Sequence, residues 1–507
     1  MKLIFNTLIL FFIFSQIIAQ SFNSLPRSTP QAQQVSSQRI IDFIDAVEKS
    51  NHEVHSLMIL RHGKVIAEGW WDPYKPELKH TMYSVSKSFT ATAIGFAVAE
   101  NKLKVTDKVI SFFPESLPST LSPNLAELEI KDLLTMSVGH EKSFNHEVFS
   151  TENWVASFLE MPIANKPGTE FLYNTSASYI LSAIIQKVTG QTLLDFLEPR
   201  LLEPLGISGL DWETDLQGIQ TGGWGIRVKT EDMAKLGQLF LQKGKWNGKQ
   251  ILPESWIEEA STLKILQEPN ASQEKFDSND WIQGYAYQMW RSRYNSYRAD
   301  GAFGQFILIL PELDAVIILT SETNDLQGLI DLVWKNILPA FDVASDKDTE
   351  LKMRLSMLSL EPLKSESNAE VEKEVSGKTY SITSKVEKVN GFSLNFQDGI
   401  CLLHLVQGPD THKMGFGSGR WILEETDRLG PNLFSFAQNQ QVGLAPFRIA
   451  GSYAWIDQRT IEFHLRYIES PHTEIIRVTF DGDKATIIFV NSFEGEDKKV
   501  NFQAEIE

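Results

Sequence analysis

The chain has 507 residues, of which 42% are hydrophobic and 22% charged. This composition is ordinary for a soluble globular protein and excludes a disordered chain or a protein with many membrane spans. Its 65 acidic and 47 basic residues give a net charge of -18, which excludes nucleic acid and anionic lipid as bulk partners. The single cysteine, Cys401, excludes an intramolecular disulfide and any zinc site that needs several thiolates.

The N-terminus has the pattern of a secretory signal peptide. Lys2 supplies the positive charge, residues 8–18 are almost entirely apolar, and Ala19 is a small residue at the cleavage point before Gln20. The apolar run is too short to span about 30 Å of hydrocarbon comfortably. We therefore interpret residues 1–19 as a signal peptide and expect no membrane insertion after its cleavage. The mature protein is predicted to be secreted or periplasmic.

Further along the chain, the pattern changes from polar to strongly periodic. Residues 20–36 are rich in Ser, Gln and Pro and are interpreted as a leader. Apolar residues then recur at helical spacing from Ser37, and two apolar runs flank the His62-Gly63 turn as a hairpin. The other elements expected in this part are a long apolar helix at 84–99, a helix through 181–188 that Gly190 ends, strands at 306–310 and 316–319, and a helix at 324–341.

These elements predict two folded parts. Strands at both ends of a mostly helical interior indicate an α+β fold over residues 37–341, with an antiparallel sheet flanked by helices. Residues 342–372 are rich in charged residues and serine and are interpreted as a linker with some helix. Residues 373–507 are expected to form a β-rich, barrel-like accessory domain. Its hairpin signals are Asn390-Gly391, Asp398-Gly399 and Asp481-Gly482.

Ser84 and Lys87 are the residues that indicate chemistry. A spacing of three places both side chains on one face of the predicted helix, one turn apart. A serine hydroxyl is a weak nucleophile until a base takes its proton, and a desolvated lysine can be that base. Ser-x-x-Lys alone is common by chance. The apolar neighbours of this pair nevertheless predict a buried helix. Lysine is rarely buried, so its presence on such a helix indicates a specific role.

Three ordered motifs extend this pair and carry a family resemblance. They are Tyr-Ser-Val-Ser-Lys-Ser-Phe at 83–89, Pro-Gly-Thr-Glu-Phe-Leu-Tyr-Asn-Thr at 167–175 and Asp-Gly-Ala-Phe-Gly-Gln-Phe at 300–306. This series resembles the serine β-lactamase and penicillin-binding family, and its class C branch in particular. Segments 131–137 and 222–225 also fit, and the resemblance covers about residues 40–340. It implies a β-lactamase/transpeptidase-like fold.

The resemblance implies a role for each matching position. Ser84 would be the acylated nucleophile, and Lys87 would hold and shuttle its proton. Tyr173 would be the partner base, with its phenolate favoured by the lysine charge, and then the acid for the leaving group. We treat Lys87 and Tyr173 as a coupled pair. The backbone N–H of Ser84 and one from Gly301 or Ala302 would bind the oxyanion.

Two departures from the family pattern bear on the substrate. Thr175 stands where the family has asparagine, so a hydroxyl replaces an amide that would recognise a β-lactam side chain. The third motif has neither Lys-Thr-Gly nor His-x-Gly, because Arg298 and Asp300 precede the glycine. Either Arg298 lines the site and supplies the positive charge, or Asp300 pairs with an arginine and is structural. Both departures argue against efficient β-lactamase activity.

Tryptophans and histidines are the remaining candidates for a site. Among the tryptophans that could line a hydrophobic cleft, core packing is favoured for Trp70 and Trp71 and a cleft role for Trp224, which lies in a Gly-rich loop; Trp281 and Trp290 stay open. The histidine pairs, His52 with His55 and His140 with His146, lack the helical spacing of a zinc protease. We expect them to be surface or core residues.

The predicted function is therefore that of an exported serine hydrolase. It would act through a Ser84 acyl-enzyme on esters, amides or D-amino-acid-containing peptides, with no metal or organic cofactor. Two other classes stay open. One is a penicillin-recognising protein that binds peptidoglycan and deacylates slowly, and the other is a non-catalytic binding scaffold. The expected partner is a small-molecule or peptide substrate, and the oligomeric state is open.

Overall fold

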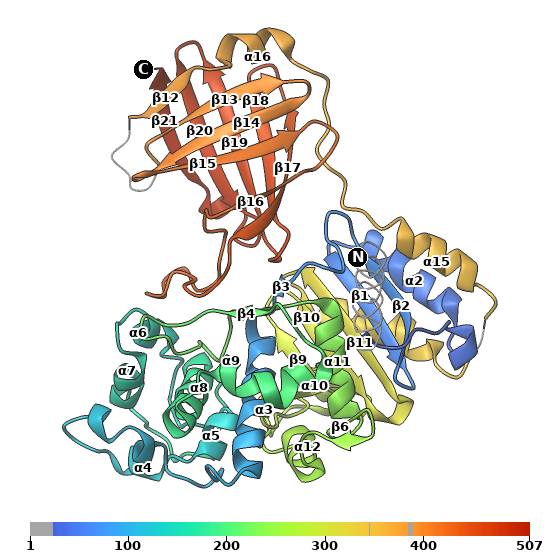
Figure 1. The fold of residues 1–507 in the computed structure, drawn as a ribbon, viewed down its shortest axis with the longest axis vertical. Helices are drawn as coiled ribbons and strands as arrows, with labels where there is room; N and C mark the ends of the chain where they lie inside the picture. The colour runs from blue at the N-terminus through green and yellow to red at the C-terminus, as the bar shows by residue number, and fades with distance from the viewer. Residues whose placement is uncertain (1–23, 344, 384–388, 507) are drawn as a thin grey trace, which may run out of the picture.

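The computed structural model describes residues 24–343, 345–383 and 389–506, and the predicted signal peptide lies outside them. A domain of helices around a sheet comes first in the chain, and a β-barrel follows it (Figure 1). The predicted α+β fold with a barrel-like second domain is confirmed. Within the described ranges, no helix combines the length and apolarity needed to cross a membrane.

A six-stranded antiparallel sheet supports the first domain. Its order, β2-β1-β11-β10-β9-β8, joins the early hairpin to strands from the far end of the domain. Ile317 and Leu319 of one central strand pack with Phe43, whereas Ile318 faces the other core. Both faces are thus covered, which explains the unbroken apolar runs. The strands are β1 (Glu53–Arg61), β2 (Lys64–Trp70), β8 (Trp290–Arg291), β9 (Tyr297–Gly301), β10 (Gln305–Leu310) and β11 (Ala315–Glu322).

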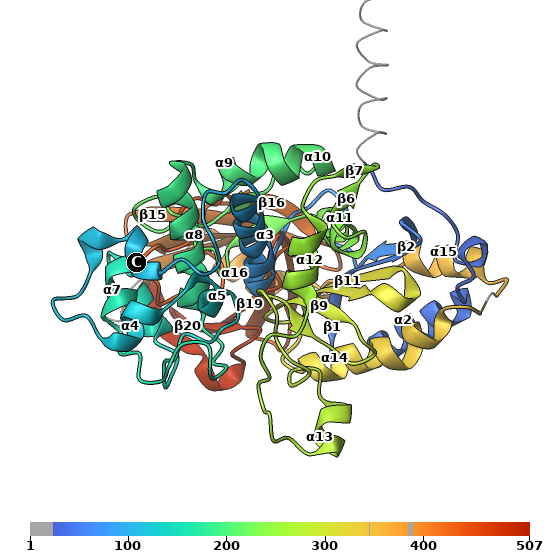
Figure 2. The ribbon, with the colours of Figure 1, turned by 90° about the horizontal axis from the view of Figure 1, so that it is seen from below.

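Helices cover this sheet and form a lobe beside it (Figure 2). The central helix, α3, lies between the lobe and the sheet and is buried along nearly its whole length. The helices of this domain are α2 (Ser37–Glu48), α3 (Ser86–Ala99), α4 (Pro123–Glu127), α5 (Ile130–Leu134), α6 (Asn145–Phe149), α7 (Trp154–Glu160), α8 (Thr175–Thr189), α9 (Leu193–Leu197), α10 (Glu203–Leu205), α11 (Thr230–Leu241), α12 (Glu254–Ser261), α13 (Gln273–Ser278) and α14 (Leu326–Leu332). Short strands complete it: β3 (His80–Thr81), β4 (Asp211–Trp212), β5 (Ile226–Val228), β6 (Lys245–Trp246) and β7 (Lys249–Gln250).

Two helix boundaries differ from the sequence prediction. The helix expected from residue 84 begins at Ser86, because Tyr83 has φ of 45° and Tyr83–Val85 forms a separate 3-10 turn. The helix expected at 324–341 is α-helical only in α14. A π turn and then a 3-10 turn follow it. Pro339 lies in that last turn, and proline cannot donate the backbone hydrogen bond that a continuing α-helix needs.

The second domain is a closed antiparallel barrel. Its strands pair in the order β15-β14-β13-β12-β21-β20-β19-β18-β17, and a parallel bridge from Gly417 to Ser452 joins β15 to β17. Alternate residues point inward, as along β14. The strands are β12 (Thr379–Ile382), β13 (Gly391–Gln397), β14 (Ile400–Gln407), β15 (Asp410–Gly417), β16 (Ile422–Thr426), β17 (Phe447–Trp455), β18 (Thr460–Tyr467), β19 (Thr473–Asp481), β20 (Lys484–Asn491) and β21 (Val500–Ile506).

The predicted hairpin signals of the barrel have different outcomes. Asp398 and Gly399 form the tight turn between β13 and β14, both with positive φ, and Asp481-Gly482 lies at the turn into β20. Asn390-Gly391 does not form a turn, because Gly391 pairs with Ser381 inside the sheet. A Cβ at Gly391 would lie 2.7 Å from the Tyr380 carbonyl oxygen. The glycine there serves a close approach of strands.

Two helices of the expected linker pack against different domains. Leu351 of α15 (Asp348–Ser356) is buried in the core around α2, and Val375 of α16 (Ala369–Val375) is buried in the barrel core. Residues 24–36 of the leader lie along the edge of the first sheet, where Ser28 N donates to Val65 O at 2.9 Å. Cys401 is buried in β14.

Candidate active site

The turn that carries Ser84 is held against the sheet by its backbone. Met82 N donates to the carbonyl oxygen of Ile226 at 3.0 Å. On the other side, the Met82 carbonyl oxygen approaches Gly301 so closely that a Cβ there would lie 2.3 Å from it. Any larger residue at 301 would force the two backbones apart. The first and third motifs, far apart in sequence, are therefore fixed to one another at the nucleophile.

Lys87 is buried beneath Ser84 and is 1% exposed. Its Nζ donates to Ser84 Oγ at 3.0 Å, to the Gly223 carbonyl oxygen at 2.7 Å and to Thr175 Oγ1 at 3.3 Å. Burial lowers the pKa of Lys87 to about 7, and the charge of Asp300 opposes that shift only in part. A large fraction of Lys87 is thus a neutral amine near neutral pH, in contact with the hydroxyl it would deprotonate.

The Gly-rich segment 222–225 supplies the carbonyl that orients Lys87. A Cβ at Gly223 would lie 2.6 Å from Thr175 Cγ2, so glycine lets this loop reach the lysine. The sequence singled out the segment through the family resemblance, but gave no sign that a backbone oxygen would act there. Thr175, expected at the substrate, lines the pocket and also contacts Lys87 from the first turn of α8.

Tyr173 completes a group of three polar side chains. The Lys87 Nζ lies 5.1 Å from the centre of its ring, and the ring stacks on Trp290 at 5.5 Å. Burial raises the pKa of Tyr173 above its ordinary value, and a hydrogen bond with Ser84 opposes this only in part. This differs from the expectation that the lysine charge favours the phenolate. The cost of burying a phenolate outweighs the opposing effects of Ser84 and Arg298.

The second motif is positioned by the segment at 131–137. Leu172 N donates to the Met136 carbonyl oxygen at 2.8 Å, and Gly168 N donates to that of Ser137 at 2.8 Å. Asn174, next to Tyr173, is turned away from Ser84. Its side chain caps α8 and lies 3.0 Å from His140. The adjacent asparagine therefore does not replace the amide that Thr175 lacks.

Arg298 does not line the catalytic pocket, which corrects one of the two sequence alternatives. Its side chain is fully buried between the rings of Trp281 and Trp290, and its Nε donates to Asp300 Oδ2 at 2.9 Å. Asp300 borders the pocket instead. Burial raises the pKa of Asp300 to about 6, against the opposing effect of Arg298. The third motif thus presents the Asp300 carboxylate to the pocket.

The pocket at Ser84 has a volume of about 540 Å³. Ala302, one of the two expected oxyanion residues, borders it, and Gly301 lies behind in β9. The residues that line the pocket are Tyr83, Ser84, Asn145, Tyr173, Thr175, Trp281, Trp290, Asp300, Ala302, Leu326, Leu433, Phe434 and Phe436. The last three come from the barrel domain. Sequence reasoning missed them, since their contact with Ser84 exists only in the tertiary fold.

The contacts of the tryptophans and histidines show which of them line the pocket and which are core residues. Trp281 and Trp290 line the pocket, whereas Trp224 is 1% exposed and is a core residue whose Nε1 donates to Glu213 at 3.0 Å. This corrects the cleft role expected for Trp224. His55 and His140 are buried, as expected for core residues. Among the described residues, no group of three or more His, Cys, Asp or Glu side chains could hold a metal ion.

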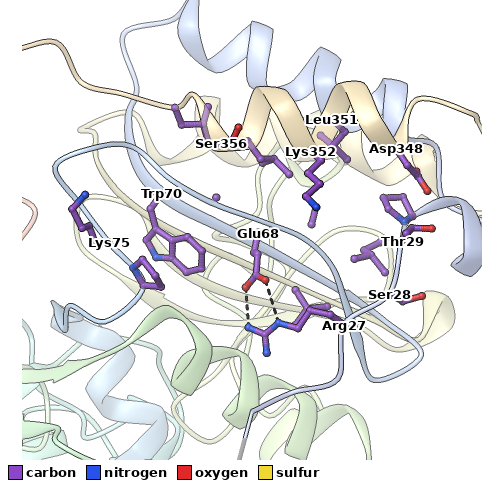
Figure 3. Close-up of a pocket in the computed structure, with 18 of the residues that line it drawn as sticks. Arg27, Ser28, Thr29, Glu68, Trp70, Lys75, Asp348, Leu351, Lys352 and Ser356 are labelled. Carbon is purple, nitrogen blue, oxygen red and sulfur yellow. Dashed lines mark hydrogen bonds and ion pairs between the residues drawn. The ribbon is translucent and has the colours of Figure 1, made fainter. Parts of the chain in front are cut away.

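A larger cavity of about 710 Å³ lies elsewhere, between β2, the leader and α15. Figure 3 shows Arg27 paired with Glu68 on one side of it, with Trp70 and Lys352 nearby. Trp70, for which packing was expected, borders this cavity. None of the residues that line it belongs to the Ser84 group, so the chemistry belongs to the smaller pocket.

Fold and site together define a serine-hydrolase-like protein. The model of the family described as Beta-lactamase matches residues 43–337, more than half of the chain, so the chain belongs to the beta-lactamase family. The 6-aminohexanoate-dimer hydrolase of Paenarthrobacter ureafaciens is 23% identical over 292 residues, 53% of this chain and 73% of that protein.

Two solved structures share the fold. A Bacillus anthracis protein assigned as a 6-aminohexanoate-dimer hydrolase has a TM-score of 0.51 at 21% identity, covering 62% of this chain and 86% of its own. A Bacteroides dorei protein assigned as a beta-lactamase has a TM-score of 0.50 at 16% identity, covering 60% and 99%. Both similarities therefore cover about three fifths of this chain.

Proposed function

We propose that this protein hydrolyses esters or amides through an acyl-enzyme on Ser84. The observation that carries the proposal is the contact of 3.0 Å between Lys87 Nζ and Ser84 Oγ, made by a lysine whose pKa burial lowers to about 7. A buried amine whose pKa lies near neutrality and which touches a serine hydroxyl is the arrangement that general-base activation requires.

In the acylation step, Ser84 Oγ bonds to the substrate carbonyl carbon while its proton moves to Lys87. The N–H groups of Ser84 and Ala302 stabilise the oxyanion that forms. As the carbonyl re-forms, the bond to the leaving group breaks, and the leaving group takes a proton from the Tyr173 hydroxyl. Lys87 returns a proton to Tyr173. In this proposal Lys87 is the base. Tyr173 is protonated at rest and passes protons between Lys87 and the leaving group.

Deacylation reverses these roles with water as the nucleophile. Water loses a proton to Lys87 through Tyr173, attacks the ester carbon, and releases the acid while Ser84 Oγ regains a proton. We include amides among the substrates because a relative is named for hydrolysing the dimer of an amino acid. D-amino-acid-containing peptides remain in the proposal as amides of the same reaction class.

The test is hydrolysis of 4-nitrophenyl acetate by the wild type and by Ser84→Ala, with mass spectrometry of the protein. We expect turnover and a transient adduct of Ser84 in the wild type, and neither in the variant. A stable penicillin adduct without ester turnover would replace this proposal by a penicillin-recognising protein. Equal rates in the two proteins, or no adduct with any ester, would overturn it in favour of a non-catalytic scaffold.

We also propose that the protein is exported, on the signal-peptide pattern of residues 1–19. N-terminal sequencing of the protein from its native host should then begin at Gln20. A protein that retains Met1 or Lys2 at its N-terminus would contradict export by this route.

A further inference from the structure

A segment of the barrel domain forms one wall of the catalytic pocket. The chain between β16 and β17 leaves the barrel and runs toward α6 of the first domain (Figure 1). Leu433, Phe434 and Phe436 of this segment border the same pocket as Ser84 and Tyr173. We call residues 433–436 the wall segment. It contributes side chains to the site from outside the region that matches the family.

The residues that directly follow the wall segment attach it to the first domain. Gln438 N donates to the Phe149 carbonyl oxygen at 2.9 Å, and Val442 O accepts from Thr214 N at 2.9 Å. Ala437 is fully buried in the core of the first domain. These contacts on the first domain's helical lobe and loops anchor the wall in place.

The two phenylalanine rings are oriented by stacking. Phe434 lies parallel to Trp224 at 4.2 Å, and Phe436 stacks on His146 at 5.1 Å. Leu433 is 41% exposed, so this large apolar side chain at the pocket still faces solvent. A ligand that covered it would gain the free energy of burying apolar surface.

The charge of the pocket excludes one class of ligand. None of the described residues that line it is lysine or arginine. Asp300 is its carboxylate, and Arg298 behind it is occupied by that carboxylate. Trp281, Trp290 and Leu326 face the site from the first domain. An anionic group bound here would meet apolar walls and the Asp300 carboxylate, with no lysine or arginine among the lining residues to pair with it.

From these observations we infer that the wall segment binds the acyl group of the substrate, and that this pocket selects uncharged, apolar acyl groups over acyl groups that carry a carboxylate. The inference rests on the proposed function, because the acyl group is the part that stays bonded to Ser84 through both steps. A pocket of about 540 Å³ is within the range that holds small organic ligands.

The test compares three 4-nitrophenyl esters: the acetate, the hexanoate and the adipate monoester, which matches the hexanoate but ends in a carboxylate. We expect kcat/KM for the hexanoate to exceed that for each of the others by about tenfold or more. Phe434→Ala and Phe436→Ala should each lower the hexanoate value by roughly tenfold and the acetate value by less than about threefold, because only the longer chain reaches the wall.

Leu429→Ala is the matched control, since Leu429 is 47% exposed in the same connection but does not line the pocket. It should leave all three values unchanged. Leu433→Arg adds a cation at an exposed position and should raise kcat/KM for the adipate monoester by roughly two- to fivefold. This gain cannot come from misfolding.

The outcomes separate this inference from the proposed function. Acetate turnover that depends on Ser84, together with equal values for hexanoate and adipate, would overturn the inference alone. So would equal losses for acetate and hexanoate in the phenylalanine variants. If the wild type turned over none of the esters and Ser84 formed no adduct, the proposed function would fail and this inference with it.

Discussion

At the scale of single residues, burial of Lys87 affects activity and stability in opposite directions. In the unfolded chain this amine is charged up to about pH 10.5, whereas in the folded protein its pKa is about 7. Between those values the unfolded state binds more protons, so folding becomes more favourable as pH rises through this window. Below pH 7 the folded protein must hold a buried charge. The protein thus bears a stability cost where it gains a base.

The pH dependence of catalysis should report this pKa. We expect kcat/KM for a neutral ester to fall below about pH 7 with a slope of one proton, because only neutral Lys87 can accept the proton of Ser84. The measurement is a pH-rate profile of the wild type from pH 5 to 9. A profile that stays flat down to pH 5 would contradict Lys87 as the base.

The neighbouring carboxylate gives this profile an internal check. The charge of Asp300 raises the pKa of Lys87, so Asp300→Asn should move the acid limb to lower pH. Thermal unfolding of the variant must be measured beside it, because the substitution leaves Arg298 buried without its ion pair. A limb that moves to higher pH would show that Asp300 acts in another way.

Tyr173→Phe should distinguish a proton relay from a base that acts alone. Removing the hydroxyl is expected to slow amide hydrolysis by about 10²–10⁴-fold, since an amine leaving group needs a proton. In kcat/KM, which reports acylation alone, a nitrophenyl ester should lose much less, because nitrophenolate leaves unprotonated. Tyr285→Phe is the control, as this buried tyrosine packs on Tyr173 with ring centres 6.4 Å apart. Equal losses of kcat/KM for ester and amide would contradict a role of Tyr173 as proton donor to the leaving group.

At the scale of elements, the turn that carries Ser84 and strand β9 act as a unit. Gly301→Ala would place a Cβ 2.3 Å from the Met82 carbonyl oxygen, where only backbone movement can relieve the clash. Since displacements of about 1 Å at a reacting group can cost 10²-fold, we expect kcat to fall by about 10–100-fold with a smaller change in KM.

Gly415→Ala in β15 is the matched control for Gly301→Ala. A Cβ there first meets the end of the flexible Glu424 side chain, at 2.9 Å, so activity should stay near that of the wild type. If Gly301→Ala also kept full kcat, the close approach of β9 to the nucleophile turn would have no catalytic importance.

Sequence patterns predicted those elements whose signals are local. The apolar runs of β10 and β11, the glycine that ends α8 and the spacing of Ser84 and Lys87 all lie within a few residues. The pattern could not reveal that Tyr83 has positive φ and delays the helix, nor that the Gly223 carbonyl oxygen orients Lys87. It also left Arg298 open between two roles, because only the tertiary fold shows that Trp281 and Trp290 pack against its side chain.

At the scale of the whole molecule, the two domains share buried polar contacts. Arg466 of β18 forms an ion pair with Glu53 of β1, and His472 connects Tyr83, beside the nucleophile, to Glu322 of β11. Although burial alone would raise the pKa of Glu53, the Arg466 guanidinium lowers it well below its ordinary value. Separating the domains would expose these polar groups to solvent or leave them without their partners. The folded domains therefore stabilise one another.

We therefore expect one cooperative thermal transition for the whole chain, despite its two domains. Calorimetry and near-ultraviolet circular dichroism should give the same midpoint, because neither domain keeps its buried contacts without the other. Two well-separated transitions would show that the barrel and the hydrolase domain unfold independently, and that the shared contacts add little free energy.

The position of the wall segment in the chain also determines when this part of the pocket is synthesised. Ser84 and Lys87 leave the ribosome long before Phe434 and Phe436. At about 5–20 residues per second, the delay is on the order of tens of seconds. During that interval Ser84 is present in the nascent chain, but its pocket lacks the wall and the contacts that the barrel makes with the first domain. Selective hydrolysis is therefore acquired only after the barrel has been synthesised.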